Sequence, residues 1–534
     1  MPSECLSYSA IPHTTALFAD YVHHFEKTRA FYPRPPFDRS WIREEAGRIR
    51  YDAARRERVA AILERQNRAW GASRETLDNI GRLRAGACVI VTGQQVTLFG
   101  GPLFALYKAI TAIKLATEVT QSGVECVPVF WLATEDHDVE EVDHITLLAA
   151  DNALKRCSAA AHGPENASVG SLRFGEDISS VAAQAAAALG ESETTEFLRE
   201  AYRPGESFGS AFGKLFSRLF KHSGVVLLDA ADPELHQVAA SVYRAAAAGA
   251  ADLDEALLQR NQQLESAGYH TQVHVTPQST LLFAQHNGAR VPVHRANGQF
   301  EIAGQKLSPA ELQARITAAP QDFSANVLLR PVVQDYLLPT LAYVGGPAEV
   351  AYFAQAAVVY EELLGRITSV LPRFAATLVE PRIQRLLDRY QIKITDAFHG
   401  EEHLRMLLAE HSLPADLNAT FDESASSLDA SLNKLNEVLE RLDKTLLDAA
   451  GTAGAKMRYQ LDRLRERAAR AQSRRSQDQA RHADDLVTAL YPHKNLQERE
   501  LAGMSYLARH GTQLLLRLYD AAQTTCADHH IVYL

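Results

Sequence analysis

The chain has 534 residues, 46% of them hydrophobic, and a formal net charge of −10. This length predicts two to four structural units with a large core, and the negative charge argues against a protein that coats nucleic acid or an anionic membrane. The five cysteines form no Cys-x-x-Cys pair, which argues against a disulfide framework or a zinc ribbon and fits a reducing cytoplasm. No signal peptide is evident, and no apolar run is long enough to span a bilayer. We therefore expect a cytoplasmic protein that works without nucleic acid or membrane.

The first part of the chain carries helical and then alternating strand and helix patterns. Residues 1–85 predict helices, including a helical stretch from Arg39 to Asn79, which a proline cluster precedes. The β-branched run Cys88–Thr92 predicts a strand, Pro102–Thr120 a helix and Val127–Leu132 a second strand. A strand–helix–strand unit implies a parallel sheet with a right-handed crossover.

Later apolar runs extend this sheet. The sequence predicts further strands at Val225–Leu228, Ala342–Gly345 and Ile367–Leu371, and inserts at about 150–205 and 232–325. The expected elements of the inserts are a helix near Ile178–Leu189 and strands at Gln272–Val275, Thr280–Phe283 and Val291–His294. We therefore predict an α/β fold with a Rossmann-like parallel-sheet core over residues 1–380.

A leucine repeat marks the region that follows, which we expect to be a helical coiled-coil domain over residues 381–490. Leucines spaced alternately by four and three residues form the seam of a coiled coil; they are Leu428, Leu432, Leu435, Leu439, Leu442 and Leu446. The arm 421–448 has seven acidic and three basic residues, and the arm 456–475 has eight basic and two acidic residues. With Gly451 and Gly454 breaking the helix between them, the two arms predict a long antiparallel hairpin.

This hairpin has two interpretations. The basic arm alone could bind RNA, whereas paired with the acidic arm it becomes the solvated surface of a coiled coil. We favour the second interpretation and expect the hairpin to form a homodimer. Residues 491–534 are expected to return to the core, with a helix from about Glu500 to Ala522.

Glycines and glutamines follow the first strand in place of a known phosphate-binding motif. The sequence has no GxGxxG after this strand and no usable P-loop; it has Gly93, Gln94, Gln95, Gly100 and Gly101. Glycines let a backbone approach a ligand, and the free amides of the helix that starts at Pro102 favour an anion. The segment predicts an anion site, although a tight turn without a ligand would need the same glycines. Lys108, well inside the helix, could instead face solvent.

Acidic residues and a histidine follow the second strand. Asp136, His137 and Asp138 come directly after Glu135 at the strand's carboxyl end, where open α/β sheets bind ligands. A carboxylate there could bind an amine or act as a general base, and His137 could transfer a proton. A metal site that also used His144 matches no zinc pattern, so we predict no metal. A solvated acidic loop is the remaining alternative.

A second Gly-Gly-Pro turn lies further along the chain. The residues before and after this turn that could bind a ligand are Arg330, Gln334, Asp335, Gly345, Gly346 and Glu349. A planar guanidinium suits a carboxylate or phosphate, so Arg330 could bind either in a ligand. A surface salt bridge made by Arg330 is an equally good interpretation of the sequence. Near the C-terminus, Lys494, Asn495, Gln497 and Arg499 could make a second nucleotide contact, or could simply lie where the chain re-enters the core.

Several of these segments, in this order, resemble the BshC family, the cysteine ligases of bacillithiol biosynthesis. The resemblance runs the full length of the chain and rests on Leu17–Phe18, Asp20–Tyr21, Phe31–Pro33, Val91–Gln95, Gly101–Leu103, Tyr107–Ala116, Pro128–Trp131, Glu135–Asp138, Leu329–Pro331, Gln334–Asp335 and Ala342–Pro347. It implies a core similar to class I aminoacyl-tRNA synthetases, a dimerising coiled coil and an adenine nucleotide, ATP or ADP. The implied reaction joins the carboxyl group of cysteine to the amine of glucosaminyl malate.

Within that resemblance, the residue roles are our own inference. We expect Asp136, His137 and Asp138 to be catalytic, and the glycines and glutamines of residues 93–102 to hold the nucleotide or the malate. The segments 93–102, 135–138 and 345–349 should converge on one pocket. Two other functions remain open: a different carboxylate-activating or nucleotidyl-transferring enzyme with the same core, and a non-catalytic coiled-coil scaffold.

Overall fold

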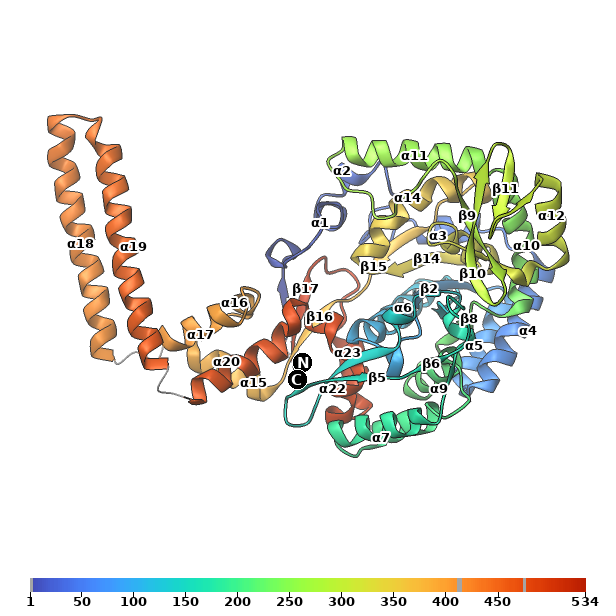
Figure 1. Ribbon diagram of the computed structural model, residues 1–534, viewed down its shortest axis with the longest axis horizontal. Coiled ribbons are helices and arrows are strands. Elements are labelled where there is room, and N and C mark those ends of the chain that lie inside the picture. The colour runs from blue at the N-terminus through green and yellow to red at the C-terminus, as the bar shows by residue number, and fades with distance from the viewer. Residues whose placement is uncertain (1–2, 411–414, 474–476) are drawn as a thin grey trace. The chain divides into compact units, whose positions relative to one another are not determined.

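A five-stranded, fully parallel sheet organises the larger part of the molecule (Figure 1). In this computed structural model, which describes residues 3–410, 415–473 and 477–534, the strand order is β15–β14–β2–β3–β8. The strands are β2 (Cys88–Gln94), β3 (Cys126–Leu132), β8 (Val226–Asp229), β14 (Thr340–Gly345) and β15 (Ser369–Pro372). All five were predicted from their apolar runs, and the Rossmann-like class is confirmed.

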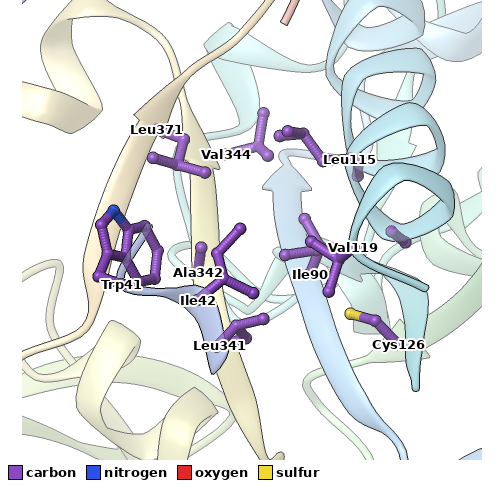
Figure 2. Close-up of a cluster of buried hydrophobic side chains, with 12 residues drawn as sticks. Trp41, Ile42, Ile90, Leu115, Val119, Cys126, Leu341, Ala342, Val344 and Leu371 are labelled. Carbon is purple, nitrogen blue, oxygen red and sulfur yellow. The ribbon is translucent and has the colours of Figure 1, made fainter. Parts of the chain in front are cut away.

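The central strands are buried on both faces, which explains their composition. Every residue of β3 and β14 is buried, so their sequences are continuous apolar runs without the alternation of a half-exposed strand. Helix α6 (Leu103–Gln121) crosses over from β2 to β3, as predicted. Figure 2 shows Leu115 and Val119 of this helix in one cluster with Ile90 of β2.

The N-terminal region adds Trp41 and Ile42 to that cluster, where they pack with Ala342 and Leu371 of the sheet (Figure 2). The helices here are α1 (Ala16–His23), α2 (Phe25–Thr28), α3 (Ile42–Arg48), α4 (Ala53–Ala69) and α5 (Arg74–Ala85). The predicted helical stretch from Arg39 to Asn79 is thus divided among three helices. Strand β1 (Ser3–Leu6), which the sequence did not suggest, pairs antiparallel with β17 (His529–Tyr533).

Both predicted inserts are present. The first contains β4 (His144–Leu148), β5 (Leu154–Ser158), β6 (Ala161–His162), β7 (Arg173–Phe174), α7 (Asp177–Leu189) and α8 (Glu193–Ala201), and α9 (Phe208–Leu219) leads to β8. The second contains α10 (Pro233–Ala248), α11 (Ala250–Ser266), β9 (Ser279–His286), β10 (Ala289–Ala296), β11 (Gln299–Ile302), β12 (Gln305–Leu307), α12 (Pro309–Ala318) and β13 (Phe323–Ala325). Its strands form a sheet in the order β12–β11–β10–β9–β13.

Two predicted elements, a strand in the second insert and a helix near the C-terminus, were wrong. Gln272–Val275 is not a strand, because the amides of Gln272 and Val273 donate to Oε1 of Gln355 instead of a neighbouring strand. The helix expected from Glu500 to Ala522 is divided into α21 (Gln497–Glu500), α22 (Gly503–His510) and α23 (Gln513–Ala521). Gly511 separates the last two with φ at +69°, a backbone conformation that glycine adopts without strain.

The chain forms two compact units, Met1–Thr377 with Glu498–Val532 and Leu378–Gln497 with Tyr533–Leu534. Between β13 and β15 the first unit also contains α13 (Arg330–Leu337) and α14 (Pro347–Leu364), and β16 (Ala376–Val379) leads out of it. The second unit is helical, with α15 (Pro381–Tyr390), α16 (Ile394–Ala397), α17 (Glu401–Glu410), α18 (Ala415–Leu442), α19 (Leu446–Ser473) and α20 (Gln477–Leu490). None of the helices in the described ranges has the length and apolar character needed to cross a bilayer.

Helices α18 and α19 form the predicted antiparallel hairpin (Figure 1). Opposite charges meet across it, because Arg458 lies 2.6 Å from Asp429 and Arg465 lies 2.9 Å from Asp422. Part of the predicted basic arm, including Arg474 and Arg475, lies outside the described residues.

The position predicted for the turn of this hairpin was wrong. The chain turns at residues 443–445, where Oδ1 of Asp443 accepts from the amide and hydroxyl of Thr445, and Leu446 already belongs to the second arm. Gly451 and Gly454 lie inside α19. A Cβ on Gly454 would come within 3.0 Å of Leu432, so this glycine lets the arms approach closely.

Candidate functional site

A cavity of about 780 Å³ opens at the carboxyl ends of β2, β3 and β14. Its lining comes from the ends of these strands, from the sheet of the second insert and from α6, α13 and α14. The lining includes Gly93, Gln94, Gln95, Lys108, Glu135, Asp136, Glu141, Arg290, Arg330, Tyr343, Gly346, Glu349, Tyr352, Arg373 and Arg499. This is the edge at which open α/β sheets bind ligands, and it brings together parts of all three predicted segments.

Lys108 lies at the centre of this arrangement, with its side chain only 5% exposed. Its Nζ donates to the carbonyl of Gly93 and to Oε1 of Gln94, both at 2.8 Å, and lies 2.6 Å from Oε2 of Glu349. The suggestion that Lys108 could face solvent was therefore wrong. Burial lowers the pKa of Lys108, while the neighbouring Glu349 carboxylate opposes that effect. Lys108 thus ties the end of β2 to the start of α14.

Glu349 is held by three donors. Besides Lys108, it accepts from the amide of Gly346 at 2.8 Å and from the hydroxyl of Tyr343 at 2.5 Å. Burial raises the pKa of this carboxyl group, but the charge of Lys108 and these hydrogen bonds outweigh burial and leave the pKa below its usual value. Glu349 is therefore an ionised carboxylate that orders the cavity wall.

Arginines contribute most of the positive charge. Arg330 donates to the hydroxyl of Tyr352 at 2.5 Å, and Arg373 forms a two-pronged ion pair with Glu498, with N–O distances of 3.0 and 2.6 Å. Arg290 donates hydrogen bonds to Ser324, to the carbonyl of Ala325 and to His137. Arg499 differs from these, because it is exposed and, among the described residues, has no hydrogen bond or ion pair. Arg499 is thus available to an anion that enters the cavity.

Glu135 is the carboxyl group in the lining that is best placed for proton transfer. Its Oε1 is buried without a hydrogen-bond partner in the described structure and lies 3.4 Å from Nε2 of His236. Burial raises the pKa of Glu135, and the charges of His236 and Arg290 only partly oppose this. A carboxyl group with a raised pKa at a cavity wall is typical of a general acid or base.

Comparison with known proteins shows the family to which the chain belongs. The model of "Bacillithiol biosynthesis BshC, N-terminal Rossmann-like domain" matches residues 1–374, and that of the family's C-terminal coiled-coil domain matches residues 376–534. The chain belongs to the BshC family. A relative from Koribacter versatilis is 48% identical over 100% of both chains, and one from Solibacter usitatus is 35% identical over 100% of both. A third, from Salinibacter ruber, is 32% identical over 97% of this chain and 96% of its own. All three carry the name "Putative cysteine ligase BshC".

Two glycines expected to hold an anion lie elsewhere in this BshC-family chain. Gly100 and Gly101 have φ at +83° and +74° and form a tight turn that lies outside the cavity lining. At the start of α6 the amides of Leu103 and Ala105 donate to the carbonyls of Leu501 and Pro102, both at 2.9 Å. These two amides are therefore not free to bind an anion.

The acidic loop divides between the cavity and its surroundings. Asp136 lines the cavity and accepts from Nε2 of Gln95 at 2.8 Å and from the amide of His137 at 2.8 Å. His137 and Asp138 are outside the lining. Arg290 can only donate, so Nδ1 of His137 is the acceptor in their 3.0 Å contact, and this nitrogen cannot take a proton from a substrate.

Several of the other residues predicted to bind a ligand lie outside the cavity lining. Gln334 and Asp335 are buried, bonded to each other at 3.1 Å, and outside the cavity lining; Asp335 lines a second cavity instead. Gly345 is outside the lining although Gly346 belongs to it. Lys494, Asn495 and Gln497 belong to the second unit, where Gln497 bonds the backbone of Leu378 and Ala489.

Several residues of this site were not predicted from the sequence: Phe104, Trp131, Arg290, Tyr343 and Arg373, and no role was proposed for Lys108. For Lys108 a signal existed, because the first half of α6, residues 103–113, is apolar nearly all round, and its exposed residues begin only at Thr117. Arg290 and Arg373 come from distant segments, and local sequence patterns carry no signal for them.

Proposed function

We propose that this chain is a cysteine ligase of bacillithiol biosynthesis that joins the carboxyl group of cysteine to the amine of glucosaminyl malate. The observation that carries the proposal is the mixed charge of the cavity, whose lining includes one lysine, four arginines and four acidic residues. Cysteine is a zwitterion, and the acceptor combines an amine with two malate carboxylates. Both substrates therefore need cationic and anionic partners in one place, and family membership makes these substrates the first to test.

The reaction that we propose has two steps. A carboxylate oxygen of cysteine attacks a phosphorus atom of ATP, and either pyrophosphate or ADP leaves. The sugar amine then attacks the activated carbonyl carbon, a C–N bond forms, and AMP or phosphate departs with the former carboxylate oxygen. The amine loses one proton, which Glu135 is placed to accept because its raised pKa favours protonation.

We also propose where the reactants bind. Arg499 is exposed and has no hydrogen-bond or ion-pair partner within the part of the chain that the structure describes, so it suits a phosphate or a malate carboxylate; Arg330 lies on the same lining. Phe104, Trp131 and Phe283 offer apolar surfaces of the kind on which an adenine ring stacks. Asp136 and Glu141, bridged by the amide of Gln95, suit the ammonium group of cysteine.

The test is a mass spectrum of the full chain incubated with ATP, cysteine and glucosaminyl malate. We expect the amide product, and we expect Glu135→Gln to lower kcat by about 10²–10⁴-fold, the usual contribution of a general acid or base. Glu140→Gln, which changes an exposed carboxylate outside the cavity lining, should leave kcat unaltered. Consumption of ATP and a different amine, without this product, would instead favour another carboxylate-activating enzyme with the same core.

A homodimer through the coiled coil and a cytoplasmic location complete the proposal. Support for the dimer comes from apolar side chains on α18 and α19 that are at least half exposed: Leu435, Val438, Leu442, Met457, Tyr459 and Leu464. Apolar surface of this extent on a soluble hairpin favours burial in a second copy.

A further inference from the structure

Two cysteines and a histidine from the two ends of the chain meet at one point that shares no residue with the cavity lining. Cys5 of β1 lies directly opposite His530 of β17 in the antiparallel register, and Cys526 precedes β17 by three residues. The sulfur of Cys5 is 3.2 Å from the sulfur of Cys526 and 4.0 Å from Nδ1 of His530. All three possible ligand atoms lie within 4.8 Å of one another.

We propose that Cys5, Cys526 and His530 bind a thiolate-preferring divalent cation, with Zn²⁺ as the expected ion. Two sulfurs and an imidazole nitrogen are a soft donor set of the kind that selects zinc over magnesium or calcium. Zn–S bonds of about 2.3 Å and Zn–N bonds of about 2.0–2.1 Å in a tetrahedron put sulfurs roughly 3.8 Å apart and sulfur roughly 3.6 Å from nitrogen. The observed 3.2 and 4.0 Å differ from these values by little more than half an ångström, which side-chain rotation can supply.

The backbone already holds the ligands in place. The pairing of β1 with β17 fixes Cys5 against His530, and the Cys-x₃-His spacing of residues 526–530 is as short as in known zinc sites. His530 is 1% exposed, its ring packs 4.9 Å from that of Phe374, and its amide donates to the carbonyl of Ala375 at 2.8 Å. Cys5 is exposed and gives an ion access from solvent.

A disulfide between the two cysteines is the competing explanation for their proximity. It would require the sulfurs to approach to about 2.0 Å, and it would leave the buried imidazole without a role. The metal uses all three groups and leaves a fourth position for water. The bound metal would link the first strand to the last. This role does not depend on the proposed ligase reaction.

The experiment uses full-length protein, reduced and freed of metal with a chelator, and then titrated with Co²⁺. We expect one Co²⁺ per chain with intense visible bands of a tetrahedral site and a thiolate charge-transfer band, all displaced by Zn²⁺. Loss of an outer-shell partner already costs roughly 10–100-fold in metal affinity, so Cys5→Ser and Cys526→Ser should each lose at least about tenfold. Cys157→Ser, at a half-buried cysteine outside the cluster, is the matched control and should bind as the unaltered chain does.

Alkylation of the unaltered protein gives a measurement that does not depend on the folding of any variant. Zn²⁺ should protect Cys5 and Cys526 from iodoacetamide and leave the labelling of Cys157 unchanged. Co²⁺ spectra without thiolate bands, or equal affinity in Cys5→Ser, would overturn the proposal. So would a Cys5–Cys526 disulfide that forms in air while the reduced protein binds no Co²⁺ through thiolates.

Discussion

Replacing Lys108 with methionine tests the ion pair at the centre of the cavity. The substitution keeps the length and apolar stem of the side chain but leaves Glu349 buried without its cation, and the carbonyl of Gly93 loses its donor. Breaking a buried ion pair by removing one partner costs about 3–5 kcal/mol. We expect the free energy of unfolding to fall by about that amount. The measurement is urea unfolding followed by tryptophan fluorescence, which reports on the first unit because Trp41, Trp70 and Trp131 all lie there.

Two further variants distinguish the effect of losing this ion pair from the effect of losing any lysine charge. Lys114→Met removes another lysine of the same helix. The Nζ of Lys114 donates to the carbonyl of Tyr519 at 2.8 Å, and the loss of this hydrogen bond should cost only about 1 kcal/mol. In the double variant Lys108→Met, Glu349→Gln, no charge is left unpaired, so part of the lost stability should return. If Lys108→Met is no more destabilising than Lys114→Met, the reasoning about this pair is refuted.

Two other predictions concern packing and assembly. A Cβ on Gly93 would lie 3.0 Å from both the Cβ and the carbonyl oxygen of Trp131, so Gly93→Ala should lower the free energy of unfolding by about 1–3 kcal/mol. Gly47→Ala in α3, with nothing within 4 Å, should raise it by up to about 1 kcal/mol; a thermal melt that ranks the two the other way would contradict the packing argument. The proposed dimer should dissociate when Leu435 and Val438, 51% and 54% exposed, are both replaced by glutamate. Light scattering measures this, and an unaltered chain that is already monomeric would disprove the dimer.

The strands of the core were predictable because parallel strands buried on both faces are continuous apolar runs, as in Cys126–Leu132. The position of the cavity was expected from the rule that ligands bind at the carboxyl ends of such strands, and Gly93, Asp136 and Glu349 all line it. The direction in which a side chain points was harder to predict. For Lys108 the sequence left solvent exposure open, whereas the first half of α6, in which it lies, is buried nearly throughout.

Other features depend on contacts between distant segments, which a local pattern cannot show. Gly100 and Gly101 had the composition of an anion site, yet the carbonyl of Leu501 accepts from the amide at the start of α6. No local spacing pattern points to the contact between Cys5 and Cys526, because 521 positions separate them in the sequence. Glycine lowers helix propensity, so Gly451 and Gly454 predict a break in the helix, whereas Gly454 in fact lets two helices approach closely.

A contact between distant segments also makes the C-terminal segment part of the cavity wall. Arg373 is held by both carboxylate oxygens of Glu498, 125 positions later, and the next residue is Arg499. Burial raises the pKa of Glu498, but the guanidinium of Arg373 outweighs burial and leaves the pKa below the usual 4.5. A carboxyl group with a lowered pKa in the folded state stabilises the protein above pH 4.5, and this contribution is lost as the pH falls through the folded-state value.

Glu498→Gln should therefore do two things. At neutral pH it should lower the free energy of unfolding by about 3–5 kcal/mol, because Arg373 stays buried without its anion. Below pH 4.5 its stability should depend less steeply on pH than that of the unaltered chain, while the exposed Glu362→Gln should follow the unaltered chain throughout. Equal slopes in acid for all three proteins would mean that the pKa of Glu498 is not lowered in the folded state, and that the charge of Arg373 does not stabilise this carboxylate.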